Sequence, residues 1–107
     1  MTPEEYRKWR PTYDSYIVMY PPNGSSYAME GSRLNKFLAT TGLVSEASEL
    51  MSVVHKAFRK NASIDLLKAK DEASDVWWYF NKILDNFGWT LEELSQHNKE
   101  KLDGRNR

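Results

Sequence analysis

The fold is decided by residues 33–87, which read RLNKFLATTGLVSEASELMSVVHKAFRKNASIDLLKAKDEASDVWWYFNKILDNF. In both halves of this stretch, apolar residues recur at steps of three and four, the spacing of one face of an α-helix. The pattern predicts two long helices, over residues 33–60 and 64–87, joined by a turn at residues 61–63. So short a connection favours an antiparallel helical hairpin. The apolar stripe consists of Leu34, Phe37, Leu38, Val44, Ala47, Met51, Val54 and Phe58 in the first helix, and of Leu66, Ala69, Ala73, Val76, Trp77, Phe80, Ile83, Leu84 and Phe87 in the second.

Local signals mark where these helices weaken and end. Gly42 is a weak point inside the first helix, because glycine has a low helix propensity. Gly88 is expected to end the second helix as its C′ residue. Thr90 then fits the N-cap of a last helix, with Glu93 completing a capping box. That last helix is expected to stop at Gly104.

The first third of the chain is less regular. Residues 3–9 predict a short helix that begins at Pro3, and Pro11 interrupts it. Residues 12–20, TYDSYIVMY, fit a helix, with a strand as the alternative. Residues 21–32 are rich in Pro, Gly and Ser and predict a loop. Because no segment alternates convincingly at period two, we expect an all-α fold, with residues 1–107 forming a single domain.

The length of the predicted helices indicates an oligomer. A helix of about 27 residues is roughly 40 Å long, whereas a compact chain of this size has a radius of gyration of about 13 Å. Two such helices would outreach a monomeric globule and leave apolar stripes uncovered. We therefore expect the hairpin to pair across subunits into a homo-oligomer of the four-helix-bundle type, either a dimer or a tetramer.

Composition narrows the setting in which the chain acts. Fifteen lysine and arginine residues balance fifteen aspartate and glutamate residues, which argues against broad adhesion to nucleic acid or to an anionic membrane. The absence of cysteine removes disulfides, thiolate metal sites and cysteine nucleophiles. The sequence begins without the apolar segment of a signal peptide, and no apolar run approaches membrane-spanning length. We expect a cytoplasmic protein with neither a nucleic-acid nor a membrane partner.

Two pairs of acidic residues are the main functional signal. Glu46 and Glu49 lie in the first helix, and Glu72 and Asp75 lie in the second, each pair with i, i+3 spacing that places it on one helical face. Folding the chain at residues 61–63 brings all four carboxylates to the same level. Four anions at one level repel one another unless a cation lies among them. The pattern predicts a site for a hard cation such as Mg²⁺, with a solvated helix face as the alternative.

Other polar side chains share the flank of these acids. Lys56 and Lys60 lie on the side of the first acidic pair and become candidates for substrate binding, although surface lysines that snorkel are the ordinary interpretation. Tyr79 follows Asp75 by one turn and is a candidate substrate contact. His55 and His97 have no metal-ligand partner at a useful spacing, so we expect both to be structural.

The segment GLVSEASELMSVVHKAFRKN, followed by DEASDVWWYF, resembles the MazG-like all-α nucleotide pyrophosphohydrolases. The signature of that family is ExxE, a variable gap and ExxD. Here it reads Glu46-x-x-Glu49, 22 intervening residues and Glu72-x-x-Asp75. Asn98-x-x-Lys101-Leu102-x-x-Arg105 is similar to the NxxKLxxR tail of the family, so that the resemblance covers about residues 34–105. Ser48 stands where many relatives have glycine.

The resemblance implies an activity and a role for each matched residue. Family members cleave nucleoside triphosphates between the α and β phosphates, releasing a monophosphate and pyrophosphate. Mg²⁺ or Mn²⁺, expected as two or more ions per site, would be held by Glu46, Glu49, Glu72 and Asp75. Glu49 would also orient or deprotonate the attacking water. Asn98, Lys101 and Arg105 would hold phosphates or close the site.

The first 32 residues and the choice between related functions are the least constrained by the motifs. Residues 1–32 show no trusted match and are expected to help form the base pocket. Within the same superfamily, the alternatives are a phosphoribosyl-ATP pyrophosphohydrolase and a dUTPase-like enzyme. A non-catalytic helical dimer is the alternative from another class. A nucleic-acid-binding module is favoured only by the aromatic residues and the basic end of the chain, and the neutral net charge weakens it.

Overall fold

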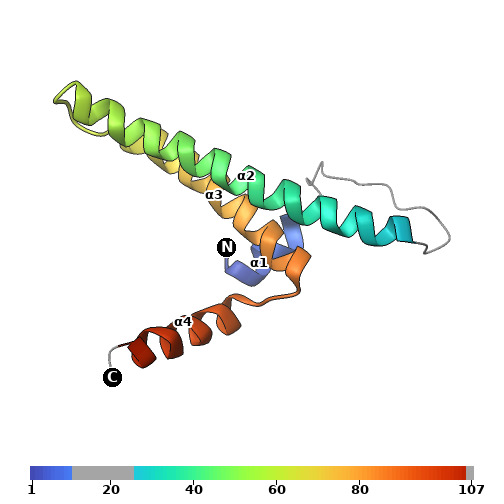
Figure 1. The fold of residues 1–107 in the computed structure, drawn as a ribbon. Coiled ribbons are helices and arrows are strands. Elements are labelled where there is room, and N and C mark those ends of the chain that lie inside the picture. Colours follow the sequence, from blue (N-terminus) through green and yellow to red (C-terminus); the bar gives the residue numbers. More distant parts are fainter. Residues whose placement is uncertain (11–25, 106–107) are drawn as a thin grey trace.

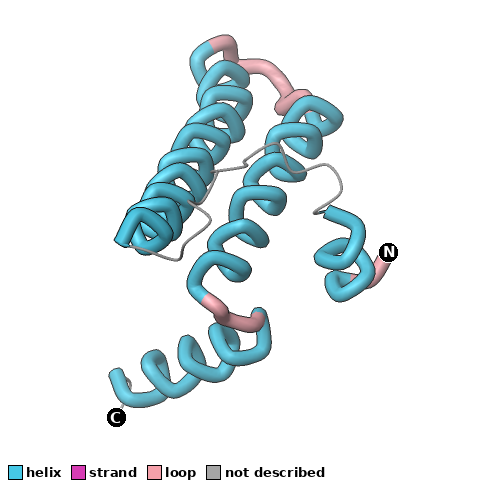
Figure 2. The backbone as a smooth tube through the Cα atoms, turned by 90° about the vertical axis from the view of Figure 1, so that its right-hand side faces the viewer, coloured by secondary structure: helices cyan, strands magenta, loops and turns pink. Residues whose placement is uncertain are grey.

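The described residues fold into helices, with short turns between α2 and α3 and between α3 and α4. The computed structural model describes residues 1–10 and 26–105, except for the side chains of residues 26–32. Over these residues, α2 and α3 form an antiparallel hairpin, and α4 leaves the end of the hairpin opposite its turn (Figure 1). The short helix α1 lies beside α3 (Figure 2). The prediction of an all-α fold is confirmed for the described residues, whose helices are α1 (Pro3–Trp9), α2 (Ser26–Arg59), α3 (Leu66–Phe87) and α4 (Leu91–Arg105).

The longest helix begins earlier than the sequence predicted. Because α2 starts at Ser26, the prediction of a loop is wrong for residues 26–32. The two prolines and the first glycine of the predicted loop all precede Ser26, and the helix contains good formers such as Ala28 and Met29. The calls on residues 12–20 and 21–25 lie outside the described residues.

The predicted ends at Gly88 and Thr90 are confirmed, and the second predicted helix begins two residues later than expected, at Leu66. Asp65 caps α3, and its carboxylate accepts a hydrogen bond from the backbone N–H of Lys68 at 3.1 Å. Gly88 ends α3 with φ of 70°, a left-handed conformation that glycine adopts without steric cost. The hydroxyl of Thr90 accepts the backbone N–H of Glu93 at 3.1 Å, as an N-cap does. The predicted stop at Gly104 is wrong: α4 continues through Arg105, because glycine weakens a helix without forbidding it.

The face that α2 turns toward α3 is not the predicted apolar stripe. Among the described side chains, the buried apolar residues of α2 are Ala39, Val53 and Ala57, which are small, and those of α3 are Ile83 and Leu84. The bulkier stripe of α2 is largely exposed in the described part of the chain, through Leu34, Phe37, Val44, Met51 and Phe58. On a helical wheel of about 100° per residue, the two faces of α2 point in nearly opposite directions. The small side chains form the contact with α3 because they let the two helix backbones approach closely.

Gly42 shows how close that approach is. A Cβ atom built on Gly42 would lie within 2.7 Å of three ring atoms of Tyr79 on α3. The glycine therefore has a packing role: it accommodates an aromatic ring against the backbone of α2. Tyr79 is half-buried in this helix contact, and its predicted contact with a substrate stays a prediction.

We expect Gly42→Ala to destabilise the protein, although alanine is the better helix former by about 1 kcal/mol. The added methyl group overpacks the contact with Tyr79, which costs typically about 1–3 kcal/mol, so that the net loss is up to about 2 kcal/mol. Urea unfolding measures the change. The double variant Gly42→Ala/Tyr79→Ala should lose less stability than Tyr79→Ala and Gly42→Ala added together. Simple additivity would contradict the packing role.

The first helix is fastened to α3 by an ion pair between a buried arginine and an exposed aspartate. Arg10, directly after α1, is 1% exposed and pairs with Asp85, and Arg7 donates to the same carboxylate at 2.9 Å. The Arg10 guanidinium also lies 5.6 Å from the ring centroid of Trp78, a cation–π distance. The two contacts with Asp85 join residues more than 70 positions apart in sequence. They fix the position of α1 along α3.

The chain is elongated. The 34 residues of α2 correspond to a rod of about 51 Å at 1.5 Å per residue. The radius of gyration is 17.4 Å, larger than the value of about 13 Å for a compact domain of this length. In the described part of the chain, none of the helices has the length and apolar character needed to cross a bilayer.

Candidate metal centre

Three of the four predicted carboxylates meet at the middle of the hairpin. One oxygen each from Glu46 on α2 and from Glu72 and Asp75 on α3 can be chosen so that all lie within 4.8 Å of one another. Glu46 and Glu72 are half-buried, and Asp75 is exposed. The antiparallel hairpin explains the meeting, because it brings the second third of α2 level with the first half of α3. We call these three side chains the acidic cluster.

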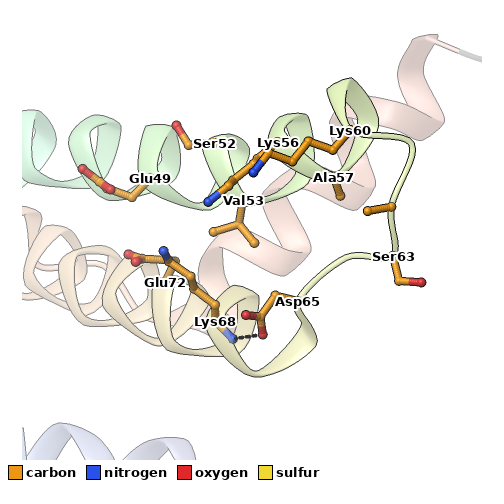
Figure 3. Close-up of a pocket in the computed structure, with 11 residues that line it drawn as sticks. Glu49, Ser52, Val53, Lys56, Ala57, Lys60, Ser63, Asp65, Lys68 and Glu72 are labelled. Atoms are coloured by element: carbon orange, nitrogen blue, oxygen red, sulfur yellow. Dashed lines mark hydrogen bonds between the residues drawn. The ribbon is translucent and has the colours of Figure 1, made fainter.

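Glu49 lies beside the acidic cluster without joining it. Three helical residues advance by about 300°, so Glu49 is turned roughly 60° away from Glu46 and is exposed on the flank of α2. Its carboxylate and that of Glu72 extend to the same side of the hairpin (Figure 3). Glu49 is therefore an exposed neighbour of the three carboxylates that converge.

The acidic cluster carries uncompensated charge. Among the described residues, none of its three carboxylates forms an ion pair with lysine or arginine. Burial raises the pKa of Glu46 above its ordinary value, and the negative charges of Asp75, Glu72 and Glu49 raise it further. Oxygen-only ligands from carboxylates, partly open to water, suit Mg²⁺ or Mn²⁺. The donor set therefore fits the predicted cation.

A metal-free pH experiment tests this repulsion. The pKa of Glu46 is higher in the folded than in the unfolded chain, so its ionisation costs stability above the folded pKa and costs nothing below the unfolded one. We expect Glu46→Gln, in EDTA, to be more stable than the wild type at pH 7.5. The advantage should fade as the pH falls through the raised pKa toward 4.5.

Thermal unfolding at several pH values measures this difference. Glu92→Gln, at an exposed position of α4, is the matched control and should show no such gain. An advantage of Glu46→Gln that does not change between pH 7.5 and 4.5 would contradict a charge effect.

A pocket of about 350 Å³ continues from the acidic cluster toward the hairpin turn. Its lining includes Glu49 and Glu72 at one end, and Lys56, Lys60 and Lys68 along its sides. The ammonium groups of the three lysines extend toward the two glutamates (Figure 3). In the described part of the chain, none of these ammonium groups forms an ion pair. We call this site the lysine pocket.

Lys56 and Lys60 were predicted from the sequence as substrate-binding residues, and Lys68 was not. Lys68 lies one turn before Glu72 on α3, an i, i+4 spacing that places both on one face. Lys56 and Lys68 are equally far from the turn, so an antiparallel hairpin brings them to the same level, as it does the acidic pairs. The signal was therefore present, but an isolated lysine in a helix does not stand out.

The predicted residues of the last helix are not brought to the site within one chain. Asn98, Lys101 and Arg105 are exposed on α4, which diverges from the hairpin at the end away from the lysine pocket (Figure 1). None of them lines that pocket. Their predicted role stays a prediction.

The fold and the site define an all-α protein whose helical hairpin carries three converging carboxylates beside a lysine pocket. The chain is 30% identical over 95 residues to the "Gene 37 protein" of Mycobacterium phage L5, and the match covers 85% of this chain and 80% of the phage protein. The chain belongs to the same family as that phage protein. No family model matches, and no solved structure matches. The name of the phage protein states no activity, so the resemblance to MazG-like enzymes stays a prediction.

Proposed function

We propose that this protein is a metal-dependent nucleoside triphosphate pyrophosphohydrolase, which converts a nucleoside triphosphate into a monophosphate and pyrophosphate. One observation carries the proposal: three converging carboxylates lie directly beside a pocket lined by three lysines. Carboxylates that gather on a hairpin attract divalent cations, and lysines attract phosphates. A ligand that satisfies both is a polyphosphate complexed with divalent metal.

The acidic cluster would hold Mg²⁺ or Mn²⁺, because Glu46, Glu72 and Asp75 offer the oxygen ligands that these ions prefer. Bound divalent ions supply charge neutralisation at the phosphates and lower the pKa of a coordinated water. With about four negative charges on the substrate beside several carboxylates, two or more ions per site are the expected number.

In this proposal, Glu49 transfers the proton and the lysines of the lysine pocket bind the phosphates. Glu49 accepts a proton from the attacking water, whose oxygen bonds to the α-phosphorus while the α–β bridging bond breaks and pyrophosphate leaves. Its position outside the three-carboxylate group leaves its oxygens available for this role. Lys56, Lys60 and Lys68 hold the β and γ phosphates and stabilise the departing pyrophosphate by charge-assisted hydrogen bonds.

The proposed enzyme is a homo-oligomer in which a second copy covers the outer face of α2. Phe37, Val44, Met51 and Phe58 recur every seven residues, and their exposed fractions are 63%, 69%, 51% and 85%. We call these four residues the outer seam. A seven-residue apolar repeat is the pattern by which helices pair side by side. Two hairpins joined along this seam make a four-helix bundle, and a second subunit could also bring its Asn98, Lys101 and Arg105 to the site.

We expect Met51→Glu to convert the oligomer into monomers at micromolar concentration, because a buried carboxylate without a partner is costly. Light scattering measures the mass. Met51→Leu keeps the apolar surface and should stay oligomeric. A wild type that is monomeric and folded at that concentration would refute the assembly.

The test of the function is a panel of the eight common ribo- and deoxyribonucleoside triphosphates with Mg²⁺ or Mn²⁺. The expected result is stoichiometric monophosphate and pyrophosphate from one or more of them, with no turnover in EDTA. Release of orthophosphate and a nucleoside diphosphate would reject the proposed cleavage. Adding phosphoribosyl-ATP to the panel, and comparing dUTP with the other nucleotides, separates the two related enzymes named by the resemblance.

The outer seam by itself also favours a second function, a non-catalytic helical dimer. Four exposed apolar residues on one face are enough to explain an interaction module. Such a dimer would assemble equally well in EDTA and in Mg²⁺, and it would hydrolyse none of the nucleotides. The panel and the light-scattering experiment therefore separate the two functions.

A further inference from the structure

A second recess adjoins the acidic cluster on the side away from the lysine pocket. It has a volume of about 260 Å³ and is lined by Tyr6 and Trp9 of α1 and by Ser74, Asp75, Trp77 and Trp78 of α3. The α3 residues of the lysine pocket lie between Asp65 and Glu72, and those of this recess between Ser74 and Trp78. The acidic cluster therefore stands between the two, and Asp75 belongs both to the cluster and to the recess. We call this site the aromatic recess.

The rings of the aromatic recess are arranged around an open space. The ring centroids of Tyr6 and Trp9 lie 5.8 Å apart, and those of Tyr6 and Trp77 lie 6.0 Å apart. Trp9 meets Trp78 edge to face at 6.4 Å. These distances are those of aromatic pairs, yet Trp9 remains 42% exposed and the other three rings are half-buried. Trp9 is thus the most exposed of the four aromatic residues of the recess.

The recess is held in shape before any ligand arrives. Arg7 and Arg10 fasten α1 to Asp85 of α3, and Arg10 also lies over the ring of Trp78. Because α1 is fixed along α3, its two aromatic side chains keep their place opposite the tryptophans of α3. A preformed site binds with less loss of conformational freedom than one that must assemble.

The size and surroundings of the recess select its occupant. Pockets for drug-sized ligands are usually about 300–1,000 Å³, so about 260 Å³ suits one planar ring system. A protein partner would need a contact of about 800 Å² per side, which so small a recess does not offer. Because Asp75 belongs to both the recess and the acidic cluster, a base in the recess and a phosphate at the cluster would lie beside the same side chain. Along α3, the distance from Lys68 to Trp78 is about 15 Å at 1.5 Å per residue, in keeping with an extended nucleotide.

We propose that the aromatic recess is the nucleobase subsite, in which the base of the substrate stacks on Trp9 and the neighbouring rings of Tyr6, Trp77 and Trp78. This inference rests on the proposed function for the identity of the phosphates at the cluster. It assigns α1 a role in substrate specificity, and it sets the direction of the substrate. The base lies toward α1, and the β and γ phosphates lie toward the hairpin turn.

The test compares a nucleotide with inorganic tripolyphosphate, which has the same phosphate chain and no base. Calorimetry with Ca²⁺ in place of Mg²⁺ would measure the binding of each of the four common deoxynucleoside triphosphates and of tripolyphosphate to the full chain. Removing one aromatic side chain from a base stack weakens binding by roughly fivefold to 150-fold. Trp9→Ala should therefore weaken the best-bound nucleotide by at least about fivefold and leave tripolyphosphate within about twofold.

Two further variants distinguish a loss of base stacking from a loss of folding. Trp9→Phe keeps a ring and should restore most of the nucleotide affinity. Trp89→Leu removes a tryptophan that stacks on Phe87 outside the recess, and it should change neither affinity. Circular dichroism checks that each variant keeps the helical content of the wild type.

Each outcome decides the inference. Equal weakening of the nucleotide and of tripolyphosphate by Trp9→Ala, no weakening of either, or a wild type that binds tripolyphosphate as tightly as every nucleotide would overturn the nucleobase subsite. A wild type that binds no nucleotide would do the same. Selective binding of nucleotides through Trp9 without any hydrolysis would keep the subsite and reject the proposed function.

Discussion

Replacing Glu49 by glutamine is expected to reduce nucleotide hydrolysis by about a thousandfold. A positioned general base contributes typically about 10²–10⁴-fold to a rate, and a carboxamide cannot accept the proton of the attacking water. Glu49 is exposed, lines the lysine pocket and stands outside the three carboxylates that converge. The substitution should therefore remove turnover without removing the ligands of the acidic cluster. Steady-state release of pyrophosphate in Mg²⁺ measures the effect.

Two comparisons make this expectation specific to proton transfer. Stabilisation by metal should survive in Glu49→Gln, because Glu46, Glu72 and Asp75 remain. Glu92→Gln, at an exposed position of α4, should hydrolyse like the wild type. Activity of Glu49→Gln within about tenfold of the wild type, or roughly 1.4 kcal/mol of barrier, would remove Glu49 from the centre of the mechanism.

Divalent metal is expected to raise the stability of the fold by about 2.7 kcal/mol at a concentration one hundred times its dissociation constant. The gain arises because the ion binds the folded acidic cluster and has no such site in the unfolded chain. For a domain of about this size, each kcal/mol raises the melting temperature by roughly 4–8 °C, so the shift should exceed 10 °C. Thermal unfolding in Mn²⁺ or Mg²⁺ and in EDTA measures it.

The double variant Glu72→Gln/Asp75→Asn locates this effect. It removes two of the three converging ligands together with their mutual repulsion. Its stability in EDTA should equal or exceed that of the wild type, and its gain with metal should fall below about 3 °C. A metal-induced shift as large in the double variant as in the wild type would place the ion elsewhere on the molecule.

Local sequence patterns were sufficient for most of the helical framework. The three-and-four spacing of apolar residues identified the hairpin, and short-range signals identified its ends: Asp65 and Thr90 cap helices, and Gly88 adopts the left-handed conformation that ends α3. Such signals act between residues a few positions apart, so those at Gly88 and Thr90 were predicted without knowing the fold, whereas the cap at Asp65 was found only in the structure. The early start of α2 at Ser26 was missed because prolines upstream suggested a longer loop than the chain forms.

The acidic cluster was predicted in part from the sequence. Counting equal distances from the turn brought the two acidic pairs level, and the structure does bring Glu46, Glu72 and Asp75 together. The count could not separate Glu49 from the others, because it gives height along the hairpin and not the direction in which a side chain points. That direction depends on how far α2 is rotated about its own axis against α3.

What the sequence by itself determined is therefore the set of helices, their caps and the level of the acidic pairs along the hairpin. Only the tertiary structure decided which face of α2 meets α3. The close contact of Gly42 with Tyr79 and of small buried residues such as Ala57 turned the bulky stripe outward. Only the tertiary structure, too, placed α1 beside Asp75, through an ion pair between residues more than 70 positions apart. Periodicity describes one helix at a time, whereas the rotation and pairing of helices depend on steric fit and charge contacts between distant segments.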